Sequence, residues 1–571
     1  MPAIVLAAIA LTFHQQNALA QDSPGPDTTS AADSLFTLAR RAQRSFEQLR
    51  IARLPTTFYR SGAGCDETIG RFCYWDEEDE DWEPGPEHED VRAARDSLIA
   101  VLMRALAVDS TNLWATGQLT RYQLETGEPA TALASLGDCG AAAWWCMSLR
   151  GLIHSRLAET EAAETAFDSA LAAMPAGQRC DWRDISHLVR DDLLDLYRSM
   201  SCSRRDTLET VFWWLADPFY LQPGNDRRVE HFARRVRNAL VRDAASTYGP
   251  RWRPDVEELL VRFGWPVGWE RNRGTPGQLS ITSHHEPTAR TFVPPQAALL
   301  DDIGKLAEEM WPIEVRLGPS RHIPPYTRRM VELPHQVGIF RRGDSLLAVA
   351  AYQLPDSLSA VPLHAALVTA TGGRASEHMT YRAESGVRGD FMSMSEAKSM
   401  VISLEVLARD ATFGARTRYG IAPPSLNSAG VGASDIIVFE VREDRIPENL
   451  DEAQFLMLGD LNIPRNAALG LYWELYGLVS ASDSVATSIS IERTDRGLLR
   501  GLFEAIGLAG RRGPEVSLEW QNASGETTRV FPRAVIVDLN DIDDGNYVIR
   551  LTVGTATGES VVVERRITIL D

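Results

Sequence analysis

The sequence contains very little lysine. Lys305 and Lys398 are the only lysines among 571 residues, so almost all positive charge is carried by arginine. Acidic residues outnumber basic ones by 78 to 58, and the formal net charge is -20. A chain of this charge would be repelled by phosphate backbones, which argues against a nucleic acid as partner.

Long apolar runs are also missing after the N-terminus, so we expect no transmembrane segment in the mature chain. The apolar run at residues 3–13 is too short to span a membrane, and Ala18-Leu19-Ala20 follows it as a small-X-small cleavage pattern. No basic residue precedes this run. We interpret residues 1–20 as a secretory signal peptide, and we expect export to the periplasm or outer cell surface of a bacterium.

The common nucleotide-binding and hydrolase motifs are absent: no P-loop, G-x-S-x-G or G-x-G-x-x-G pattern occurs. Gly343–Leu346 spells "GDSL", the nucleophile block of a lipase-like hydrolase family. No histidine follows His378, however, and the tetrapeptide lies where a hairpin turn is expected. His284 and His285 stand in a stretch that we interpret as a solvated linker. The sequence therefore predicts no cofactor, no metal site and no catalytic residue.

The six cysteines all stand in the first half of the chain. Six cysteines allow 15 pairings, and pairing of neighbours would close three short loops. These pairs are Cys65 with Cys73, Cys139 with Cys146, and Cys180 with Cys202. Zinc binding is the alternative, but no pair has C-x-x-C spacing. We therefore predict disulfides, which agree with export.

Residues 32–204 have helical periodicity and contain a repeat-like pattern. Gly151, Ala163, Phe167, Ala170 and Pro175 have the spacing of a tetratricopeptide repeat of ~34 residues. Small residues let two helices approach closely, Phe167 fills the gap, and proline ends the second helix. The region resembles the tetratricopeptide family, which implies a concave face that binds peptides or proteins. A plain helical spacer is the alternative.

The hydrophobic period changes to two after Thr327, in short runs separated by Gly, Asp and Asn turns. This pattern predicts antiparallel sandwiches. The predicted fold class is multidomain: all-α helical repeats at 32–204, a mainly helical domain with a linker at 205–326, and β-sandwich domains at 327–445 and 446–571. The linker is expected at residues 270–296.

The central domain contains an ordered set of short motifs. "FWWLADP" at 212–218 is followed by Asn225-Asp226, "YGPRWRPD" at 248–255 and "VRFGWP" at 261–266. In order and spacing they resemble the GWxTD-domain family of exported bacterial proteins. Trp252 and Asp255 fit the name motif, whereas Pro254 replaces the threonine. The resemblance implies tetratricopeptide-like helices before this domain and β-rich segments after it, but no defined reaction.

The motifs supply eight candidate binding or family-motif residues: Trp213, Asp217, Asn225, Arg235, Trp252, Asp255, Gly264 and Pro266. We expect a helix that begins at Pro254 and ends at a left-handed Gly264. Trp252, Trp265 and Trp269 are expected to cover its apolar face. Asp217 is expected to cap a turn or to pair with Arg234 or Arg235.

Two interpretations of these motif residues stay open. The first is a tryptophan-rich packing corner held by ion pairs. The second is a ligand pocket in which a sugar stacks on tryptophan.

The sequence thus favours an exported, non-enzymatic scaffold or binding protein of the bacterial cell envelope. It would engage a partner protein through the helical repeats, an envelope glycan, or both. The alternative is an exported hydrolase with an unrecognised active site in the central domain. The hydrolase hypothesis requires Asp217, Asp255 and a histidine or arginine to meet in a cleft that solvent reaches.

Overall fold

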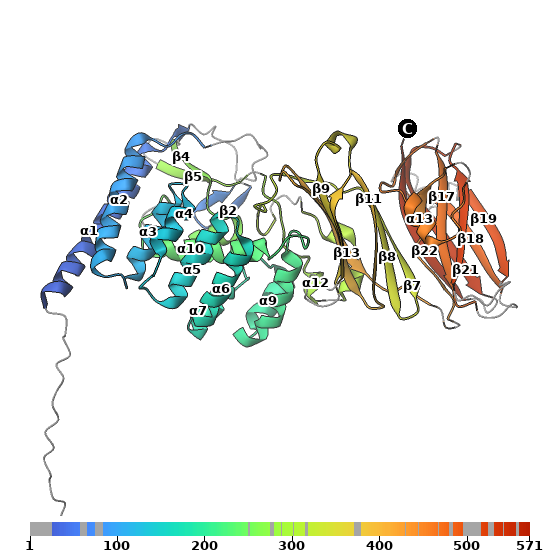
Figure 1. Ribbon diagram of the computed structural model, residues 1–571, viewed down its shortest axis with the longest axis horizontal. Helices are drawn as coiled ribbons and strands as arrows, with labels where there is room; N and C mark the ends of the chain where they lie inside the picture. Colours follow the sequence, from blue (N-terminus) through green and yellow to red (C-terminus); the bar gives the residue numbers. More distant parts are fainter. Residues whose placement is uncertain are drawn as a thin grey trace, which may run out of the picture.

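The chain folds into an elongated molecule with helices at one end and sheets at the other (Figure 1). The computed structural model describes residues 26–57, 66–74, 84–248, 252–273, 279–286, 288–300, 302–313, 318–370, 378–426, 428, 430–442, 445–465, 467–478, 484–494, 516–523, 530–540, 542–555 and 559–570. The predicted signal peptide at 1–20 lies outside these ranges. The predicted order of an α-helical half followed by a β-rich half is confirmed.

The helical half is built from hairpins of short helices. Its helices are α1 (Pro26–Arg53), α2 (Glu89–Val108), α3 (Leu113–Leu124), α4 (Pro129–Leu136), α5 (Ala143–Arg156), α6 (Thr160–Ala173), α7 (Ala176–Arg183), α8 (Asp191–Ser199), α9 (Cys202–Ala216), α10 (Asp226–Arg242) and α11 (Pro254–Phe263). In the α5–α6 hairpin a Cβ at Gly151 would lie 2.6 Å from the Phe167 ring. The two helices of this hairpin therefore lie close together, as the spacing of small residues in the sequence predicts.

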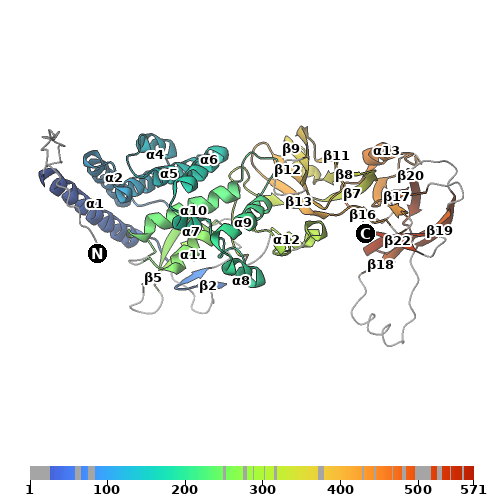
Figure 2. The same cartoon turned by 90° about the horizontal axis from the view of Figure 1, so that it is seen from below.

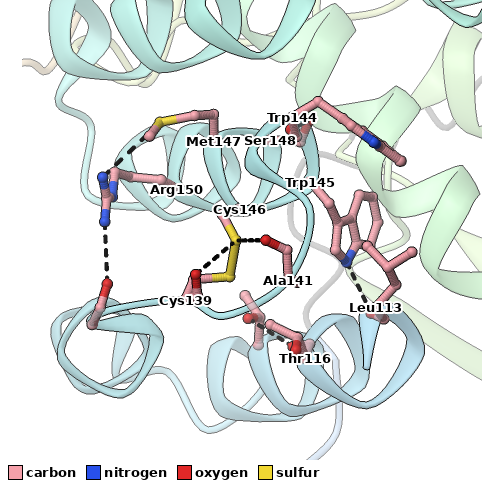
Figure 3. Close-up of a disulfide and its surroundings, with 12 residues drawn as sticks. Leu113, Thr116, Cys139, Ala141, Trp144, Trp145, Cys146, Met147, Ser148 and Arg150 are labelled. Atoms are coloured by element: carbon pink, nitrogen blue, oxygen red, sulfur yellow. Dashed lines mark hydrogen bonds between the residues drawn. A yellow bond between two sulfur atoms is a disulfide. The ribbon is translucent and has the colours of Figure 1, made fainter. Parts of the chain in front are cut away.

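Two of the predicted disulfides are present. Cys139 pairs with Cys146 at the turn before α5 (Figure 3), and Cys180 joins α7 to Cys202 at the start of α9. These four cysteines are therefore not zinc ligands. Cys65 lies outside the described residues, so its predicted pairing with Cys73 does too.

Helix α10 packs along the first helices of the two repeat-like hairpins, α3 and α5 (Figure 2). Phe232 and Val236 of α10 share one buried core with Leu149 and Leu152 of α5. The Gln118 side chain on α3 donates a hydrogen bond of 2.8 Å to the Leu240 carbonyl. The side of the α3 and α5 helices that contacts α10 is therefore covered by a helix of the same chain.

Short strands fill part of the expected linker. β4 (Gly268–Arg273) pairs with β5 (Leu279–His284) and with β1 (Thr56–Thr57), and β2 (Glu67–Ile69) pairs with β3 (Phe72–Tyr74). The sequence interpretation missed this hairpin because β4 is polar and is completed by a strand more than 200 residues earlier. α12 (Ala297–Leu300), η1 (Ile303–Lys305) and η2 (Glu308–Met310) lead into the β-rich half.

The first β unit has two sheets around one core. Its strands are β6 (Met330–Val331), β7 (His335–Arg342), β8 (Ser345–Gln353), β9 (Leu363–Ala370), β10 (His378–Ser385), β11 (Arg388–Glu396), β12 (Met400–Ala408) and β13 (Gly414–Ile421), and η3 (Asp356–Leu358) follows β8. One sheet has the order β10-β9-β12-β13-β6 and the other β11-β8-β7. Buried side chains of both sheets form a single cluster. The "GDSL" tetrapeptide forms the β7–β8 turn, as expected, with Gly343 at φ 63°.

The second β unit also has two sheets around one core, which contains the fully buried Trp473. Its elements are β14 (Gly432–Ala433), β15 (Ile437–Glu440), α13 (Leu450–Leu456), β16 (Asn462–Pro464), β17 (Ala468–Tyr476), β18 (Ser484–Arg493), β19 (Val516–Ala523), β20 (Val530–Asp538), β21 (Gly545–Thr555) and β22 (Ser560–Leu570). β17 pairs with β14, β15 and β20, and the other sheet has the order β16-β22-β21-β18-β19. Because β14 and β15 pair with β17, this unit begins before the expected boundary at residue 446.

None of the helices that the structure describes is long and apolar enough to cross a membrane.

Candidate functional site

Asn225 and Trp213 join α9 to α10. The Asn225 side chain caps α10 by accepting a hydrogen bond of 2.9 Å from the Arg228 amide. It also donates a bond of 2.6 Å to the Trp213 carbonyl near the end of α9. The Trp213 ring is buried against Phe212 and His231. Both motif residues therefore fix the angle between two helices.

Arg234 and Gly264 join α10 to α11. Nη1 of Arg234 donates to the carbonyls of Val261 (3.0 Å) and Arg262 (2.8 Å), which end α11. Gly264 follows with φ 81° and ψ -172°, and a Cβ there would lie 3.1 Å from Arg234 Nη2. The prediction that Gly264 has a positive φ is confirmed, and the guanidinium above it gives a second reason for glycine.

Asp255 is bound at the start of α11 rather than in a cleft. Its two carboxylate oxygens accept hydrogen bonds of 2.7 and 2.9 Å from the Arg71 guanidinium on the β2–β3 turn. A hydrogen bond from Arg71 lowers the pKa of this carboxyl. Gly70, at φ 54°, leaves the space that Asp255 occupies. The helix begins at Pro254, as predicted.

Trp252 and Arg235 tie the same helices together. Trp252 Nε1 donates to Asn238 Oδ1 on α10 (2.6 Å), and Arg235 Nη1 donates to Glu257 Oε1 on α11 (2.6 Å). The three tryptophans expected to cover α11 pack against its apolar face, which is also confirmed. These contacts match the packing-corner interpretation.

Of the two roles expected for Asp217, the structure shows the turn cap and not the ion pair with Arg234 or Arg235. Its Oδ1 accepts a hydrogen bond of 3.2 Å from the Phe219 amide. Burial, with the nearby charge of Asp226, raises the pKa of Asp217. Arg234 and Arg235 are engaged by α11 instead.

The arginines that meet the Asp217 turn come from the β-rich half. Arg418 Nη1 donates to the Leu215 and Asp217 carbonyls (3.1 and 2.7 Å), and Arg416 Nη1 donates to the Asp217 and Pro218 carbonyls (2.9 and 2.7 Å). These carbonyls close the C-terminal end of α9, where positive charge is favourable. The joint between the two halves is therefore ionic and buried.

Glu405 on β12 balances the charge of Arg418. Its Oε1 lies 3.0 Å from Arg418 Nη2, both side chains are 0% exposed, and its Oε2 accepts a bond of 2.9 Å from the Leu221 amide. The sequence analysis did not select these residues. A lone glutamate in an apolar strand and two arginines spaced by two along β13 are the pattern that indicates them.

A buried acid–histidine pair lies at the start of α10. Asp226 accepts hydrogen bonds from His322 Nε2 (2.6 Å) and from the Tyr326 hydroxyl (2.7 Å). Burial lowers the pKa of His322, despite its carboxylate partner. None of the three residues lines any of the cavities described here. This cluster could move a proton, but no described cavity brings a substrate to it.

Asp217 and Asp255 do not meet in one cleft, although the hydrolase hypothesis requires that they do. Asp255 binds the β2–β3 turn, whereas Asp217 lies at the joint with β13. Neither residue lines a described cavity.

A cavity of about 590 Å³ opens between the repeat-like helices and the segment that follows α11. Pro266, Trp265 and Trp269 line it. Six arginines also line it: Arg50, Arg53, Arg95, Arg121, Arg156 and Arg237. Pro266 is thus the one member of the eight candidate residues found in a cavity wall.

Four of these arginines are paired with carboxylates and two are not. The pairs are Arg50 with Glu125, Arg53 with Asp90, Arg95 with Glu87, and Arg121 with Glu47. Within the described part of the chain, Arg156 and Arg237 form no hydrogen bond or ion pair. Burial lowers the pKa of Arg237 to about 10, the charge of Glu230 opposes this shift, and the charge of Arg156 adds to it.

A larger groove of about 890 Å³ lies between the two β units. The segment that leads into the first β unit, including Glu308 and Trp311, also lines it. The basic side chains in its wall have partners, and Arg416 donates hydrogen bonds to the Asp217 and Pro218 carbonyls. His335 lies 3.6 Å from Glu308, and Arg566 lies 3.1 Å from Glu309. The cavity of the helical half is therefore the better candidate for recognition of a charged ligand.

No protein-family model matches the chain, and no curated protein matches it. Solved structures that resemble parts of it include the following three. The soluble domain of PmoD from Methylocystis sp. ATCC 49242 (Rockwell) is 14% identical at a TM-score of 0.14, over 24% of this chain and 91% of that one. A calcium-binding mutant of Bacteroides uniformis beta-glucuronidase 2 is 9% identical at 0.16, over 39% and 26%. The FN1–FN3 domains of chicken CNTN1 are 12% identical at 0.14, over 43% and 69%. Similarities at TM-scores this low give no information about the function of this chain.

Proposed function

We propose that this chain is an exported, non-enzymatic binding protein of the GWxTD-domain type, acting in the bacterial cell envelope. Tetratricopeptide-like hairpins and the motif-bearing helices form one scaffold, and the two C-terminal sandwiches extend from it. The cavity that contains Arg156, Arg237 and two tryptophans is the ligand site. The observation that carries this proposal is the presence in that cavity of two guanidinium groups, those of Arg156 and Arg237, that form no hydrogen bond or ion pair with a described residue.

The roles of the motif residues support binding over catalysis. Asn225, Gly264 and Asp255 are engaged in helix caps and helix joints. A general acid or base has to reach the proton that it transfers, and these groups are held by backbone or arginine instead. The two disulfides support export, since such bonds persist in oxidising compartments.

The covered face of the repeats decides where a partner binds. Because α10 fills the surface of α3 and α5, the repeats act as a frame around the cavity, and a partner engages the cavity instead. Arg156 is the last residue of α5 and Arg237 lies on α10, so the repeats and their filling helix both contribute to the site.

Retention on envelope material tests the proposal. The purified protein and its Arg156→Gln/Arg237→Gln variant are passed over immobilised envelope fractions, with glycan and protein fractions kept separate. Arg104→Gln is the control, because Arg104 is an exposed arginine on α2 that lines none of the cavities. We expect retention of the wild type and the control and loss in the double variant. Equal retention of all three proteins would show that the cavity is not the binding site.

The hydrolase alternative is favoured by one observation, the hydrogen-bonded Asp226–His322 pair. A broad hydrolase substrate panel compares the wild type with Asp226→Asn and with Asp255→Ala, each checked for an unchanged melting temperature. Turnover that is lost in a folded Asp226→Asn variant would support the alternative. The binding proposal predicts no turnover in any of the three proteins.

A further inference from the structure

Arg156 and Arg237 line a common cavity, and neither guanidinium group forms a hydrogen bond or ion pair with a described residue, although the charge of Glu230 acts on Arg237. Arg237 is half-buried and Arg156 is exposed. The charge of Arg156 acts unfavourably on that of Arg237, and an anion bound between the two groups would relieve this repulsion. A planar carboxylate suits such a pair, because guanidinium groups bind it through two parallel hydrogen bonds. Because the chain as a whole has a net charge of -20, these two neighbouring positive charges are a local feature of the cavity.

Two tryptophans stand in the wall of the same cavity. Trp265 and Trp269 line it, with ring centroids 5.7 Å apart in an edge-to-face arrangement. Tyr248 packs edge-on against both rings and fixes their orientation. Rigid indole rings offer an apolar surface at little entropic cost. The apolar face of a pyranose ring, which carries C–H groups, is a fitting occupant.

Carboxylates stand in the wall beside the arginines. Glu87, Glu125 and Glu270 line the cavity, so its wall contains hydrogen-bond acceptors as well as donors. Hydroxyl groups both donate and accept, and such a wall therefore suits a ligand rich in hydroxyls. The same carboxylates repel a ligand of high negative charge such as a polyphosphate.

From these three features we infer that the cavity binds an acidic sugar, a hexuronate unit of an oligosaccharide, with its carboxylate between Arg156 and Arg237 and its ring against Trp265 and Trp269. This inference rests on the proposed binding function and adds the class of ligand to it. The volume of about 590 Å³ suits one or two sugar units.

Isothermal titration of the full protein with digalacturonate tests the inference, with digalactose as the neutral match. An acidic dipeptide and sodium sulfate supply carboxylate without sugar and anion without carboxylate. We expect digalacturonate to bind about tenfold or more tightly than digalactose, since a charge-assisted hydrogen bond of this kind contributes about that much. Arg237→Gln and Arg156→Gln should each weaken binding of digalacturonate about tenfold, and Arg104→Gln should leave it unchanged. Digalacturonate should also change the tryptophan fluorescence of the wild type, and this change should shrink in Trp269→Phe.

Each contrary result would overturn a specific part of this inference. Equal binding of digalactose would overturn recognition of the carboxylate. Binding of the acidic dipeptide or of sulfate at least as tightly as digalacturonate would overturn the sugar class and leave the binding function standing. If none of the four ligands binds while retention on envelope fractions still depends on Arg156 and Arg237, the sugar class fails alone. If that retention is also unchanged in the double variant, the binding function fails with it.

Discussion

The Arg418 guanidinium on β13 donates a hydrogen bond of 2.7 Å to the Asp217 carbonyl at the end of α9. The two residues are 201 positions apart in the chain. Glu405 neutralises the same arginine, and both of these charged side chains are fully buried. A short motif in the helical half is thus completed by a strand of the β-rich half, which couples the two parts mechanically.

Glu405→Gln tests this joint. The substitution leaves the Arg418 charge buried without its carboxylate, and breaking a buried ion pair in this way costs about 3–5 kcal/mol. Urea unfolding followed by tryptophan fluorescence measures the loss. Glu440→Gln is the matched control, because Glu440 pairs with Arg442 on the surface, where such pairs contribute about 1 kcal/mol or less. Similar losses in the two variants would contradict a buried joint.

Gly264→Ala should destabilise the α10–α11 corner. The backbone there has φ 81° and ψ -172°, a conformation almost restricted to glycine, and the new methyl group would press on the Arg234 guanidinium. A cost of about 1–3 kcal/mol is expected from the backbone alone. Thermal unfolding provides the measurement. Gly177→Ala in α7 is the control and should be neutral or slightly stabilising, since its Cβ meets nothing within 4 Å; the prediction fails if both variants melt alike.

Phe232→Ala should unfold the repeat-like hairpins although Phe232 lies outside them. Its ring is buried on α10, 5.7 Å from the Phe167 ring of α6. Truncation of a buried phenylalanine costs about 3–5 kcal/mol. Circular dichroism of the helical signal during urea titration measures this loss. Phe455→Ala removes a ring that is 75% exposed, and a change within about 0.5 kcal/mol is expected. An equally small effect at Phe232 would show that the repeats do not depend on α10.

His285 should make stability fall in acid. Burial lowers the pKa of His285 to about 3, whereas an unfolded histidine titrates near pH 6.5. Between about pH 6 and pH 4 the unfolded state therefore binds a proton that the folded state does not, and stability falls by about 1.4 kcal/mol per pH unit from this residue. The groups around it are the Phe263 carbonyl, which accepts from Nδ1 at 3.0 Å, the Ser283 hydroxyl and the charges of Arg234 and His284.

The measurement for His285 is a set of urea unfolding curves at pH 7.5, 6.5, 5.5 and 4.5. His285→Gln retains a hydrogen-bond donor and cannot titrate, so its stability should decline less steeply with falling pH than that of the wild type. His88→Gln serves as the control, because His88 is exposed at the start of α2. Parallel curves for the wild type and His285→Gln would show that this histidine does not contribute to acid unfolding.

Local sequence patterns were enough to predict the motif helix and its ends. Pro254 and Gly264 bound α11 because a fixed φ suits the first turn and a positive φ ends the last one. Close packing in the α5–α6 hairpin and two of the disulfides also followed from spacing. Each of these features depends on residues that are near one another in the chain.

The candidate site did not follow from local pattern. Arg156 and Arg237 lie on different helices, and only the packing of α5 against α10 brings them into the wall of one cavity. The β4–β5 hairpin escaped prediction for a related reason, since β1 completes its sheet from the other end of the helical half.

The sequence by itself determined the order of an α-helical half and a β-rich half and the ends of the α11 helix. These properties rest on hydrophobic period, backbone restrictions of proline and glycine, and residue spacing, all of which act over short stretches. Only the tertiary structure decided that α10 covers the repeats, that β13 caps α9 and that two arginines share a cavity. Burial and charge balance depend on every group that packs around a residue, and those groups come from distant parts of the chain.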